Sequence, residues 1–492
     1  MSKNSDELFK NVIGHAKEYG FVFPSSEIYD GLSAVYDYGQ LGAELKNNIK
    51  AYWWKSMVQL NENIVGIDSA IFMHPKIWKA SGHVDGFADP MIDNKDSKKR
   101  YRADNLIEDK IAKYESQGKT LKAETLQTEM DLALKADDLP RLKALIEEYE
   151  IVCPVSGTRN WTDVRQFNLM FSTQMGAMAE GSDEVYLRPE TAQGIFVNFL
   201  NVQKSGRMKI PFGIAQIGKA FRNEVIARQF IMRMREFEQM EMQFFVRPGT
   251  EMQWYAYWKE ARLKWHLAVG TSSEKYRYHD HTKLAHYANA AVDIEFEFPF
   301  GFKEVEGIHS RTDFDLSQHQ QFSGKKMQYF DNDLNEEGKA YGNYVPFVIE
   351  TSIGLDRMFL LTMCNAYEEQ DLSTADKTDS RTVLRLHPTL APIKAAVLPL
   401  IKKDGLPEKA REIMNNLKLD FNMQYDEKDS IGKRYRRQDA IGTPFCITID
   451  HQTLEDNMVT IRHRDSMEQE RVAINELEKI IGDLVGWKNL LN

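Results

Sequence analysis

Three stretches of this chain alternate their residues with the period of a β-strand, and they constrain the fold more than any other feature. In 235–246 one face carries Phe237, Gln239, Glu241 and Gln243, and the other carries Met240, Met242 and Phe244. In 344–354, Glu350 and Ser352 share a face, and in 214–224 Arg222 and Glu224 do. The sequence therefore predicts a sheet that gathers acids, amides and an arginine at one place.

Two arginines far apart in the sequence stand beside these stretches, each with an acidic neighbour. Arg222 lies in Phe221-Arg222-Asn223-Glu224, and Arg357 lies in Gly354-Leu355-Asp356-Arg357. A guanidinium group stays charged and binds phosphate oxygens in pairs, so it suits a triphosphate. The pattern indicates a nucleotide site. An ordinary ion pair between Arg222 and Glu224 across a sheet is the alternative.

These segments resemble the signature motifs of class II aminoacyl-tRNA synthetases. Phe-Arg-x-Glu followed by Arg233 to Phe237 is similar to motif 2, and Gly-Leu-Asp-Arg is similar to motif 3. Single short matches occur by chance, but their order and the segments between them are more specific. Nearly the whole chain resembles the dimeric family of glycyl-tRNA synthetases, on Tyr36-Asp37-Tyr38-Gly39, Arg188 to Gly194, Arg235 to Glu241 and Arg311 to Leu316.

The resemblance implies an α/β (α+β) fold with an antiparallel-sheet catalytic core, a helical insertion and a C-terminal α/β anticodon-binding domain. The expected boundaries are 1–103 for the first part of the core with motif 1, 104–150 for the insertion, 151–368 for the core with motifs 2 and 3, 369–384 for a linker and 385–492 for the anticodon-binding domain. The implied enzyme is a ligase that uses ATP and Mg²⁺ to attach glycine to tRNA(Gly) through a glycyl-adenylate, releasing AMP and pyrophosphate, and that works as a homodimer.

The motifs, carried over residue by residue, imply a nucleotide site. Arg222 and Arg357 are the expected catalytic residues, the first at the α-phosphate and the substrate carboxylate, the second at the γ-phosphate end. Phe237 is expected beneath the adenine and Glu224 at its amino group. The expected ATP-binding set is Arg222, Asn223, Glu224, Met232, Arg233, Met234, Arg235, Glu236, Phe237, Glu304, Val305, Gly354, Leu355, Asp356 and Arg357. Glu304 is the candidate magnesium ligand, with a solvated loop acid as the alternative.

Glycine offers only an ammonium and a carboxylate, so ionic and hydrogen-bonding groups must select it. Glu190, Glu350 and Ser352 resemble the family's ammonium cage, and Arg311 resembles the group that faces the substrate. The expected glycine-binding set is Arg102, Glu190, Phe237, Glu238, Gln239, Met240, Glu241, Arg311, Glu350, Thr351, Ser352, Ile353 and Gly354. Taken alone, Arg102 is an ordinary surface arginine. A filled pocket is expected to exclude larger amino acids.

Cysteine and histidine spacing gives no complete metal signature. Many members of the resembling family carry Cys-x-x-Cys pairs at the places of 94–97 and 153–156, but three of the four positions here are Asn94, Ser97 and Ser156. One thiolate, Cys153, cannot hold a structural zinc, so we predict no zinc. With Cys364 and Cys446 the cysteines are too few for a disulfide framework, which favours a reducing compartment. His83, His281 and His286 are predicted to be structural.

Charge is uneven along the chain. The net charge of −10 argues against binding nucleic acid through a broadly basic surface. Residues 385–492 carry equal numbers of acidic and basic side chains, and the basic cluster Lys433, Arg434, Arg436 and Arg437 is a candidate contact for a polyanion. No stretch approaches about 18 uninterrupted apolar residues and the first ten residues are polar, so we expect a cytoplasmic protein without a membrane span.

Local patterns place the remaining elements. A helix over 41–60 and a strand over 64–73 resemble motif 1, which builds the dimer interface in class II; an ordinary helix and edge strand is the alternative. The charged stretch 104–150, with a helix start at Asp138 to Pro140, predicts either a solvated appendage or a tRNA contact. Residues 369–381 lack periodicity and predict a linker, and alternating strands and helices follow it.

Two rival functions stay open from the sequence. A non-catalytic binding protein with this fold should have lost its phosphate and ammonium groups, which are present here. A class II synthetase for threonine, proline or histidine is the second rival. A threonyl enzyme needs a zinc set, and a larger apolar pocket would not need three acids.

Overall fold

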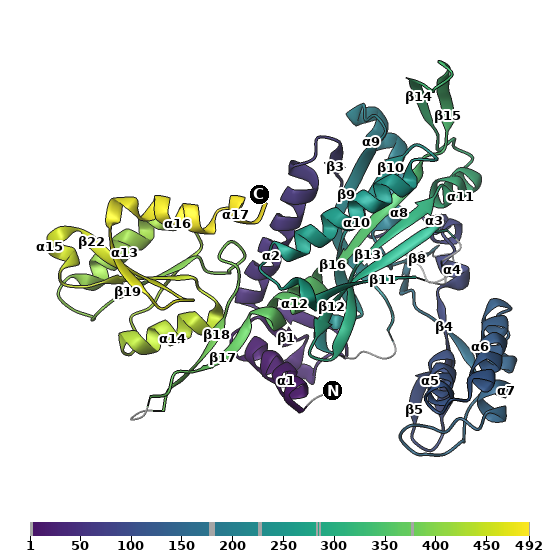
Figure 1. The fold of residues 1–492 in the computed structure, drawn as a ribbon, viewed down its shortest axis with the longest axis horizontal. Helices are drawn as coiled ribbons and strands as arrows, with labels where there is room; N and C mark the ends of the chain where they lie inside the picture. The colour runs from purple at the N-terminus through teal and green to yellow at the C-terminus, as the bar shows by residue number, and fades with distance from the viewer. Residues whose placement is uncertain are drawn as a thin grey trace. The chain divides into compact units, whose positions relative to one another are not determined.

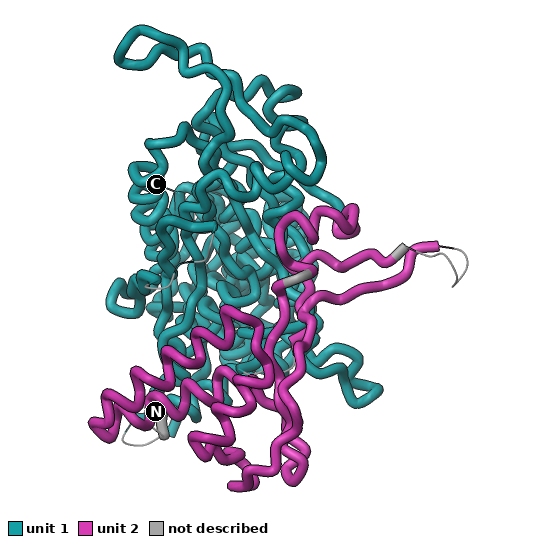
Figure 2. Tube along the Cα trace, turned by 90° about the vertical axis from the view of Figure 1, so that its right-hand side faces the viewer, with its two compact units in different colours: residues 1–70, 190–219, 229–492 teal, residues 71–189, 220–228 magenta. Residues whose placement is uncertain are grey.

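A computed structural model describes residues 3–176, 183–224, 229–281, 284, 287–374 and 378–491 (Figure 1). The chain divides into two compact units, Met1–Ala70 with Glu190–Lys219 and Gln229–Asn492, and Ile71–Pro189 with Ala220–Arg228 (Figure 2). None of the helices among the described residues is both long and apolar enough to cross a membrane.

A seven-stranded sheet forms the centre of the first unit, in the order β11-β12-β13-β16-β10-β9-β3. The strands are β3 Ile64–Gly66, β9 Phe212–Phe221, β10 Glu236–Val246, β11 Tyr276–Asp280, β12 Ala290–Phe298, β13 Gly301–Thr312 and β16 Phe347–Gly354. β11, β12, β13, β16 and β10 pair antiparallel in turn, and the short β3 runs parallel to its neighbour β9. The predicted antiparallel core is confirmed.

Helices cover both faces of this sheet (Figure 1). The alternation of β10 explains the arrangement, because Met240, Met242 and Phe244 belong to one apolar cluster and Phe245 belongs to another. The first cluster includes residues of α1 Lys3–Glu18, α2 Gln40–Trp54, α10 Glu251–Leu267 and α12 Leu355–Ala366. The second includes residues of α8 Ala192–Val197, α9 Phe199–Gly206 and α11 Phe314–Ser323.

The predicted helix 41–60 and strand 64–73 are present with different bounds. Leu41, Leu45 and Ile49 bury one stripe of α2, and the chain continues as a π-helical turn, Lys55–Gln59. β3 ends at Gly66; beyond it the Ile67 amide donates to the Ala215 carbonyl at 2.9 Å, and the Ser69 amide donates to the side-chain Oε1 of Gln216 at 2.6 Å. The predicted strand was therefore too long.

The second unit contains the predicted helical insertion. Its helices are α5 Ala103–Ser116, α6 Thr120–Lys135 and α7 Leu139–Glu148, beside β4 Ala88–Asn94, β5 Lys99–Arg102 and β6 Arg165–Asn168. Their apolar faces form one buried cluster with Trp161 and Cys153. Asp138 accepts a hydrogen bond from the Arg141 amide at 2.9 Å and Pro140 lies in the first turn, which confirms the predicted start of α7.

The C-terminal part is an α/β unit with its own sheet, in the order β20-β19-β21-β22-β23. Its strands are β19 Ala395–Pro399, β20 Met423–Tyr425, β21 Phe445–Ile449, β22 Met458–His463 and β23 Gln469–Ala473, and its main helices are α13 Leu406–Leu417, α14 Ile431–Ile441 and α16 Leu477–Val485. Buried residues of α13, α16 and all strands but β23 form its core. The predicted C-terminal α/β fold is confirmed.

The segment predicted as a linker is largely a β-hairpin. β17 Tyr367–Asp371 pairs with β18 Ser380–Leu384. The sequence of this hairpin shows little hydrophobic periodicity because its strands contact the rest of the chain through charged side chains. The remaining elements of the described residues are β1 Val22–Pro24, β2 Tyr36–Tyr38, α3 Lys76–Ala80, α4 His83–Gly86, β7 Ser172–Met175, β8 Asp183–Tyr186, β14 Tyr329–Leu334, β15 Ala340–Tyr344, α15 Thr453–Asp456, α17 Lys488–Leu491 and four short 3-10 turns.

Candidate active site

The predicted polar face of the sheet lies on the side that carries α8 and α11. Pairing of β10 with β16 puts Glu241 opposite Ser352 and Gln243 opposite Glu350. The alternating residues Met240 and Met242 are fully buried on the other side. The sequence prediction that these strands gather acids and amides in one place is confirmed.

Glu350 is the centre of this face. Its carboxylate accepts hydrogen bonds from the Arg311 NH1 at 2.9 Å, the His309 Nδ1 at 2.7 Å and the Gln243 Nε2 at 2.7 Å. Burial opposes the negative charge, but the guanidinium of Arg311 and the imidazole of His309 outweigh it, so the pKa of Glu350 lies well below its usual range. Glu350 is therefore an ionised acid at neutral pH.

Arg311 is held by a second acid and by aromatic rings. Its Nε and NH2 donate to the two carboxylate oxygens of Asp315 at 2.8 and 3.1 Å. Its guanidinium lies 4.1 Å from the Tyr287 ring centre and 5.5 Å from that of Phe196. This fork is fully engaged, so Arg311 is a fixed positive charge next to Glu350.

Glu241 occupies a different environment from Glu350. The Thr191 hydroxyl donates to its Oε2, and the Gln243 Nε2 donates to its Oε1 at 2.8 Å. The carboxyl is 2% exposed, and burial together with the charges of Glu350 and Glu190 raises the pKa of Glu241 well above its usual range. The pocket thus holds one stabilised carboxylate and one acid that resists ionisation.

Several of the residues predicted to bind the substrate glycine come together on this face of the sheet, and others do not. Glu190 accepts from Gln193, Gln239 accepts from the Thr191 amide and lies 3.4 Å from Ser352, and Glu241, Arg311 and Glu350 complete the group. The side chains of Met240, Thr351 and Ile353 are buried on alternate strand positions, so only their backbone can line this pocket. Arg102 belongs to the second unit, where it pairs with Asp89 and Asp104.

Glu238 and Asp356 point away from the polar face. Glu238 forms ion pairs with Lys46 at 2.7 Å and Lys50 at 2.6 Å. Asp356 accepts from the Tyr38 hydroxyl, from Lys46 Nζ at 2.8 Å and from the Glu238 amide at 2.7 Å. Strand alternation turns the Glu238 side chain to the face opposite Gln239 and Glu241, and the Asp356 side chain lies with it; their predicted roles in binding glycine and ATP stay predictions. The two acids join α2 to β10 and to the start of α12.

Arg357 lies in the first turn of α12 and pairs with Glu304 of β13. Its NH1 lies 3.0 Å from Glu304 Oε2 and 3.1 Å from the Glu304 carbonyl oxygen, and its Nε donates to the Met232 carbonyl at 3.4 Å. The structure therefore brings together three members of the predicted nucleotide set. The Glu304 side chain is 47% exposed, so its carboxylate is also accessible to solvent.

Other members of the predicted nucleotide set have buried side chains or contact neighbouring segments. The side chains of Val305, Met232, Met234 and Leu355 are buried. Arg235 donates to the Ser33 carbonyl at 3.2 Å, and Glu236 pairs with Lys219. Arg233, Phe237 and Gly354 are neighbours of these residues in the chain, and Gly354 precedes α12 as its N-cap.

Arg222, Asn223 and Glu224 lie beyond the end of β9, which stops at Phe221. The predicted shared strand face of Arg222 and Glu224 is therefore wrong. Within the second unit the Arg222 Nε donates to the Pro189 carbonyl at 3.1 Å, and the guanidinium lies 5.5 Å from the Phe87 ring centre. The Asn223 amide donates to Leu169 at 2.8 Å. These contacts orient the segment without strand pairing.

Sequence reasoning missed several members of the pocket. His309, Thr191, Gln193 and Asp315 all hydrogen-bond to predicted residues. Only His309 had a usable signal, because it stands two residues before Arg311 on the strand β13 and so shares its face. The others come from helix starts, where no simple period applies.

The histidines singled out from the sequence have hydrogen-bond partners. His83 Nδ1 lies 2.8 Å from the Ser81 hydroxyl, and His281 pairs with Asp293 at 2.8 Å. His286 lies outside the described residues. Within the described part of the chain no three metal-ligating side chains of His, Cys, Asp or Glu cluster together.

Cys153 lies at the centre of a hydrogen-bonded cluster between two turns of the second unit. The hydroxyls of Ser97 and Tyr101 each lie 3.3 Å from its Sγ, and the Ser156 amide lies 3.5 Å away. Ser156 also donates to Asn94 Oδ1 at 3.0 Å. Although burial opposes it, these hydrogen bonds lower the pKa of the Cys153 thiol to about 6. The four positions therefore meet in space and are joined by hydrogen bonds.

We expect Cys153→Ala to lower the free energy of unfolding by about 1–3 kcal/mol, because buried donors lose their acceptor. The folded-state pKa lies below the ordinary value of 9.0, so this contribution is fully present above pH 9 and shrinks as the pH falls towards 6. Urea unfolding between these pH values measures it. Cys364→Ala is the control, because burial raises the pKa of that thiol to about 12. An equal loss at all pH values would contradict the prediction.

The predicted basic cluster of the C-terminal part is largely paired within the chain. Arg434 is buried and donates to the carbonyls of Pro399 and Leu400 at 2.6 and 3.1 Å. Arg436 pairs with Asp379, and Arg437 pairs with Asp426 and Asp429. The predicted polyanion contact is therefore wrong for the buried Arg434; it stays a prediction for the partly exposed Arg436 and Arg437 and for the exposed Lys433.

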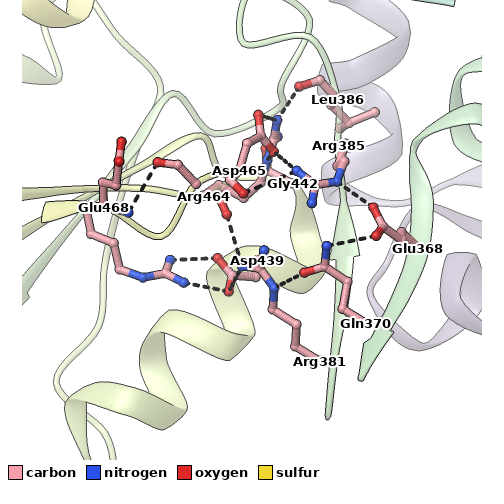
Figure 3. Close-up of polar contacts among 12 residues, drawn as sticks. Glu368, Gln370, Arg381, Arg385, Leu386, Asp439, Gly442, Arg464, Asp465 and Glu468 are labelled. Atoms are coloured by element: carbon pink, nitrogen blue, oxygen red, sulfur yellow. Dashed lines mark hydrogen bonds and ion pairs between the residues drawn. The ribbon is translucent and has the colours of Figure 1, made fainter. Parts of the chain in front are cut away.

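Charged residues also join the hairpin β17–β18 to the C-terminal α/β unit (Figure 3). Asp439 of α14 accepts from Arg381 of β18 at 3.0 Å and from Arg462 of β22 at 2.8 and 3.0 Å. Arg385 pairs with Glu368 at 2.5 Å and with Asp465 at 3.1 Å. Asp439 is fully buried between two guanidinium groups, so it is the hub of this network.

Asp439→Asn is expected to destabilise the fold by about 3–5 kcal/mol, because it leaves two buried arginines without their counter-charge. Thermal or urea unfolding measures the loss. Asp420→Asn, at an exposed position after α13, is the matched control and should change stability little. Equal stability of the two variants would show that Arg381 and Arg462 find other partners.

Protein-family models match three parts of the chain. They are described as "Glycyl-tRNA synthetase insertion domain 1" at residues 89–125 and 117–169, "tRNA synthetase class II core domain (G, H, P, S and T)" at 171–366 and "Anticodon binding domain" at 394–484. The "Glycine--tRNA ligase" of Chlorobaculum tepidum is 53% identical over 96% of this chain and 98% of its own length. Proteins of the same name from Macrococcus caseolyticus and Geobacillus thermodenitrificans are each 52% identical, over 98% and 97% of this chain and 99% and 98% of their own lengths.

Proposed function

This chain belongs to the glycine–tRNA ligases of class II, and we propose that it catalyses the ATP-dependent attachment of glycine to tRNA(Gly). The observation that carries the proposal is the hydrogen-bonded cluster of the acids Glu190, Glu241 and Glu350 beside Arg311. A substrate without a side chain is bound through its charged groups alone, and these residues supply the charges.

The first step joins glycine to AMP. A glycine carboxylate oxygen attacks the α-phosphorus of ATP, the bond to the bridging oxygen breaks, and pyrophosphate leaves with that electron pair. Two anions approach each other, so the residues act by positioning and charge neutralisation. We propose that Arg222 binds the α-phosphate, that Arg357 binds the γ-phosphate end and that Phe237 stacks on the adenine. In the second step a tRNA hydroxyl attacks the carbonyl carbon and AMP leaves.

Magnesium would bind next to Arg357. The Glu304 carboxylate is a half-exposed oxygen donor, which fits Mg²⁺ because this ion takes one or two carboxylates together with phosphate oxygens and water. When bound, the ion neutralises charge on the phosphate oxygens. The 3.0 Å ion pair with Arg357 holds the Glu304 side chain beside the γ-phosphate end of the proposed nucleotide site.

We propose the domain boundaries 1–103, 104–150, 151–368, 369–384 and 385–492, with tRNA(Gly) as the partner of the last domain and the cytoplasm as the site of action.

We also propose a homodimer. Its support is the strongly exposed apolar group Ile28, Tyr29 and Leu32, at 88%, 80% and 57% exposure. Sedimentation equilibrium of the wild type and of Tyr29→Asp tests the dimer; a wild-type monomer would refute it.

Pyrophosphate exchange tests the proposed function. Labelled pyrophosphate should enter ATP when glycine is present, and should not do so with alanine, serine, threonine or proline. Charging of tRNA(Gly) with labelled glycine tests the second step. Exchange that depends on another amino acid would refute the substrate, and the absence of exchange with any amino acid would favour a non-catalytic protein.

A further inference from the structure

The proposed glycine site gathers acids. Glu190, Glu241, Glu350 and Asp315 are joined by hydrogen bonds through Gln193, Gln243 and Arg311. Arg311 bonds to Asp315 and Glu350, and His309 bonds to Glu350. Like charges in a buried site disfavour one another, so an acid without a cationic partner is expected to hold a proton.

Glu241 has less support for a charge than Glu350. Both of its hydrogen-bond donors, the Thr191 hydroxyl and the Gln243 amide, are neutral. Among the described residues no lysine, arginine or histidine forms an ion pair with it, whereas Glu350 has two cationic partners. Burial and the charges of Glu350 and Glu190 raise the pKa of Glu241, in agreement with this geometry.

Gln243 couples Glu241 to Glu350. Gln243 is fully buried, and its Nε2 donates to Glu241 Oε1 at 2.8 Å and to Glu350 Oε2 at 2.7 Å. One amide nitrogen therefore holds the two carboxyl groups close together, and the charge on Glu350 disfavours a charge on Glu241.

We propose that Glu241 carries a proton in the empty site and releases it to solvent when the substrate ammonium binds. The inference rests on the proposed function. The ammonium brings the positive charge that the proton supplied before, and a charged Glu241 is then one of its partners. Glycine binding should therefore release up to one proton per site.

His309 is the other group that can release a proton. Burial lowers its pKa, but the hydrogen bond to Glu350 outweighs burial and raises it. Asp293 also faces His309 from β12, and Arg311 opposes its charge. A substrate ammonium that competes with His309 for Glu350 would weaken the hydrogen bond that raises the pKa of His309, and His309 would then lose its proton more readily. The experiment must therefore separate Glu241 from His309.

Calorimetric titration at pH 7 in buffers of different ionisation enthalpy counts the protons. The probe is glycyl-sulfamoyl-adenosine, which carries the ammonium. Its glycoloyl counterpart, with a hydroxyl in that place, is the matched control ligand. We expect release of up to one proton with the first and none with the second. Glu241→Gln should abolish the release, and His309→Asn should retain it.

Release that persists in Glu241→Gln and disappears in His309→Asn would overturn the proposal in favour of His309. Wild-type binding without release would overturn it as well. If Glu241→Gln does not fold, His309→Asn still decides: below the pKa of Glu241, its dissociation constant for the glycyl probe should fall by up to tenfold for each unit that the pH rises, and a flat profile contradicts the proposal. If the glycyl probe does not bind and a threonyl analogue does, the proposed function fails instead.

Discussion

Replacement of Arg222 by alanine is expected to lower glycine-dependent pyrophosphate exchange by about 10²–10³-fold while the protein stays folded. Charge develops on the α-phosphate as the glycine carboxylate attacks, and a donor aimed at such charge stabilises the transition state more than the ground state. The Arg222 Nε donates to the Pro189 carbonyl, which fixes the plane of the guanidinium. The effect should therefore appear mainly in kcat.

Arg165→Ala is the matched control, because Arg165 is an exposed arginine of the same unit, on β6. Circular dichroism and the unfolding midpoint check that both variants fold. Arg222→Lys should recover only part of the rate, because lysine keeps the charge and loses the planar fork. Near-normal exchange by a folded Arg222→Ala protein would remove Arg222 from the proposed mechanism.

Strand alternation predicted the glycine pocket because a period of two follows directly from strand geometry. Gln239, Glu241, Glu350 and Ser352 are found where the period puts them. The same rule, applied to every residue of the strand β10, would have placed the Glu238 side chain on the face opposite Gln239 and Glu241. It failed for Arg222, because β9 ends one residue earlier and the period ends with it.

Pairing between distant charges could not be predicted from the sequence. Arg434 has the sequence context of a surface basic cluster, yet it donates to carbonyls of a neighbouring loop. Arg381 has the context of a polar linker, yet it reaches Asp439 nearly sixty residues later. A charge run shows which residues are ionised, but only the fold shows whether their partners are solvent or protein. The anticodon-binding role therefore rests on the family match and not on this cluster.

Replacement of Glu350 by glutamine is expected to raise the KM for glycine by about a hundredfold and to leave the KM for ATP nearly unchanged. The substrate ammonium would lose a carboxylate whose charge Arg311 and His309 stabilise before the substrate binds, since they hold the pKa of Glu350 below its usual range. A lost charged hydrogen bond of this kind costs a few kcal/mol, and each 1.4 kcal/mol corresponds to about tenfold.

The side chains around Glu350 determine whether the variant stays folded, and so whether its KM values can be compared with those of the wild type. Arg311 keeps both hydrogen bonds to Asp315 in the variant, so the buried guanidinium retains a counter-charge and the fold should persist. Glu297→Gln, an exposed acid on β12, is the control and should change neither constant. Exchange kinetics with glycine and ATP varied separately give both constants. Equal rises in the two would mean that Glu350 serves the nucleotide or the architecture of the sheet, because only a group that contacts the ammonium changes the glycine requirement alone.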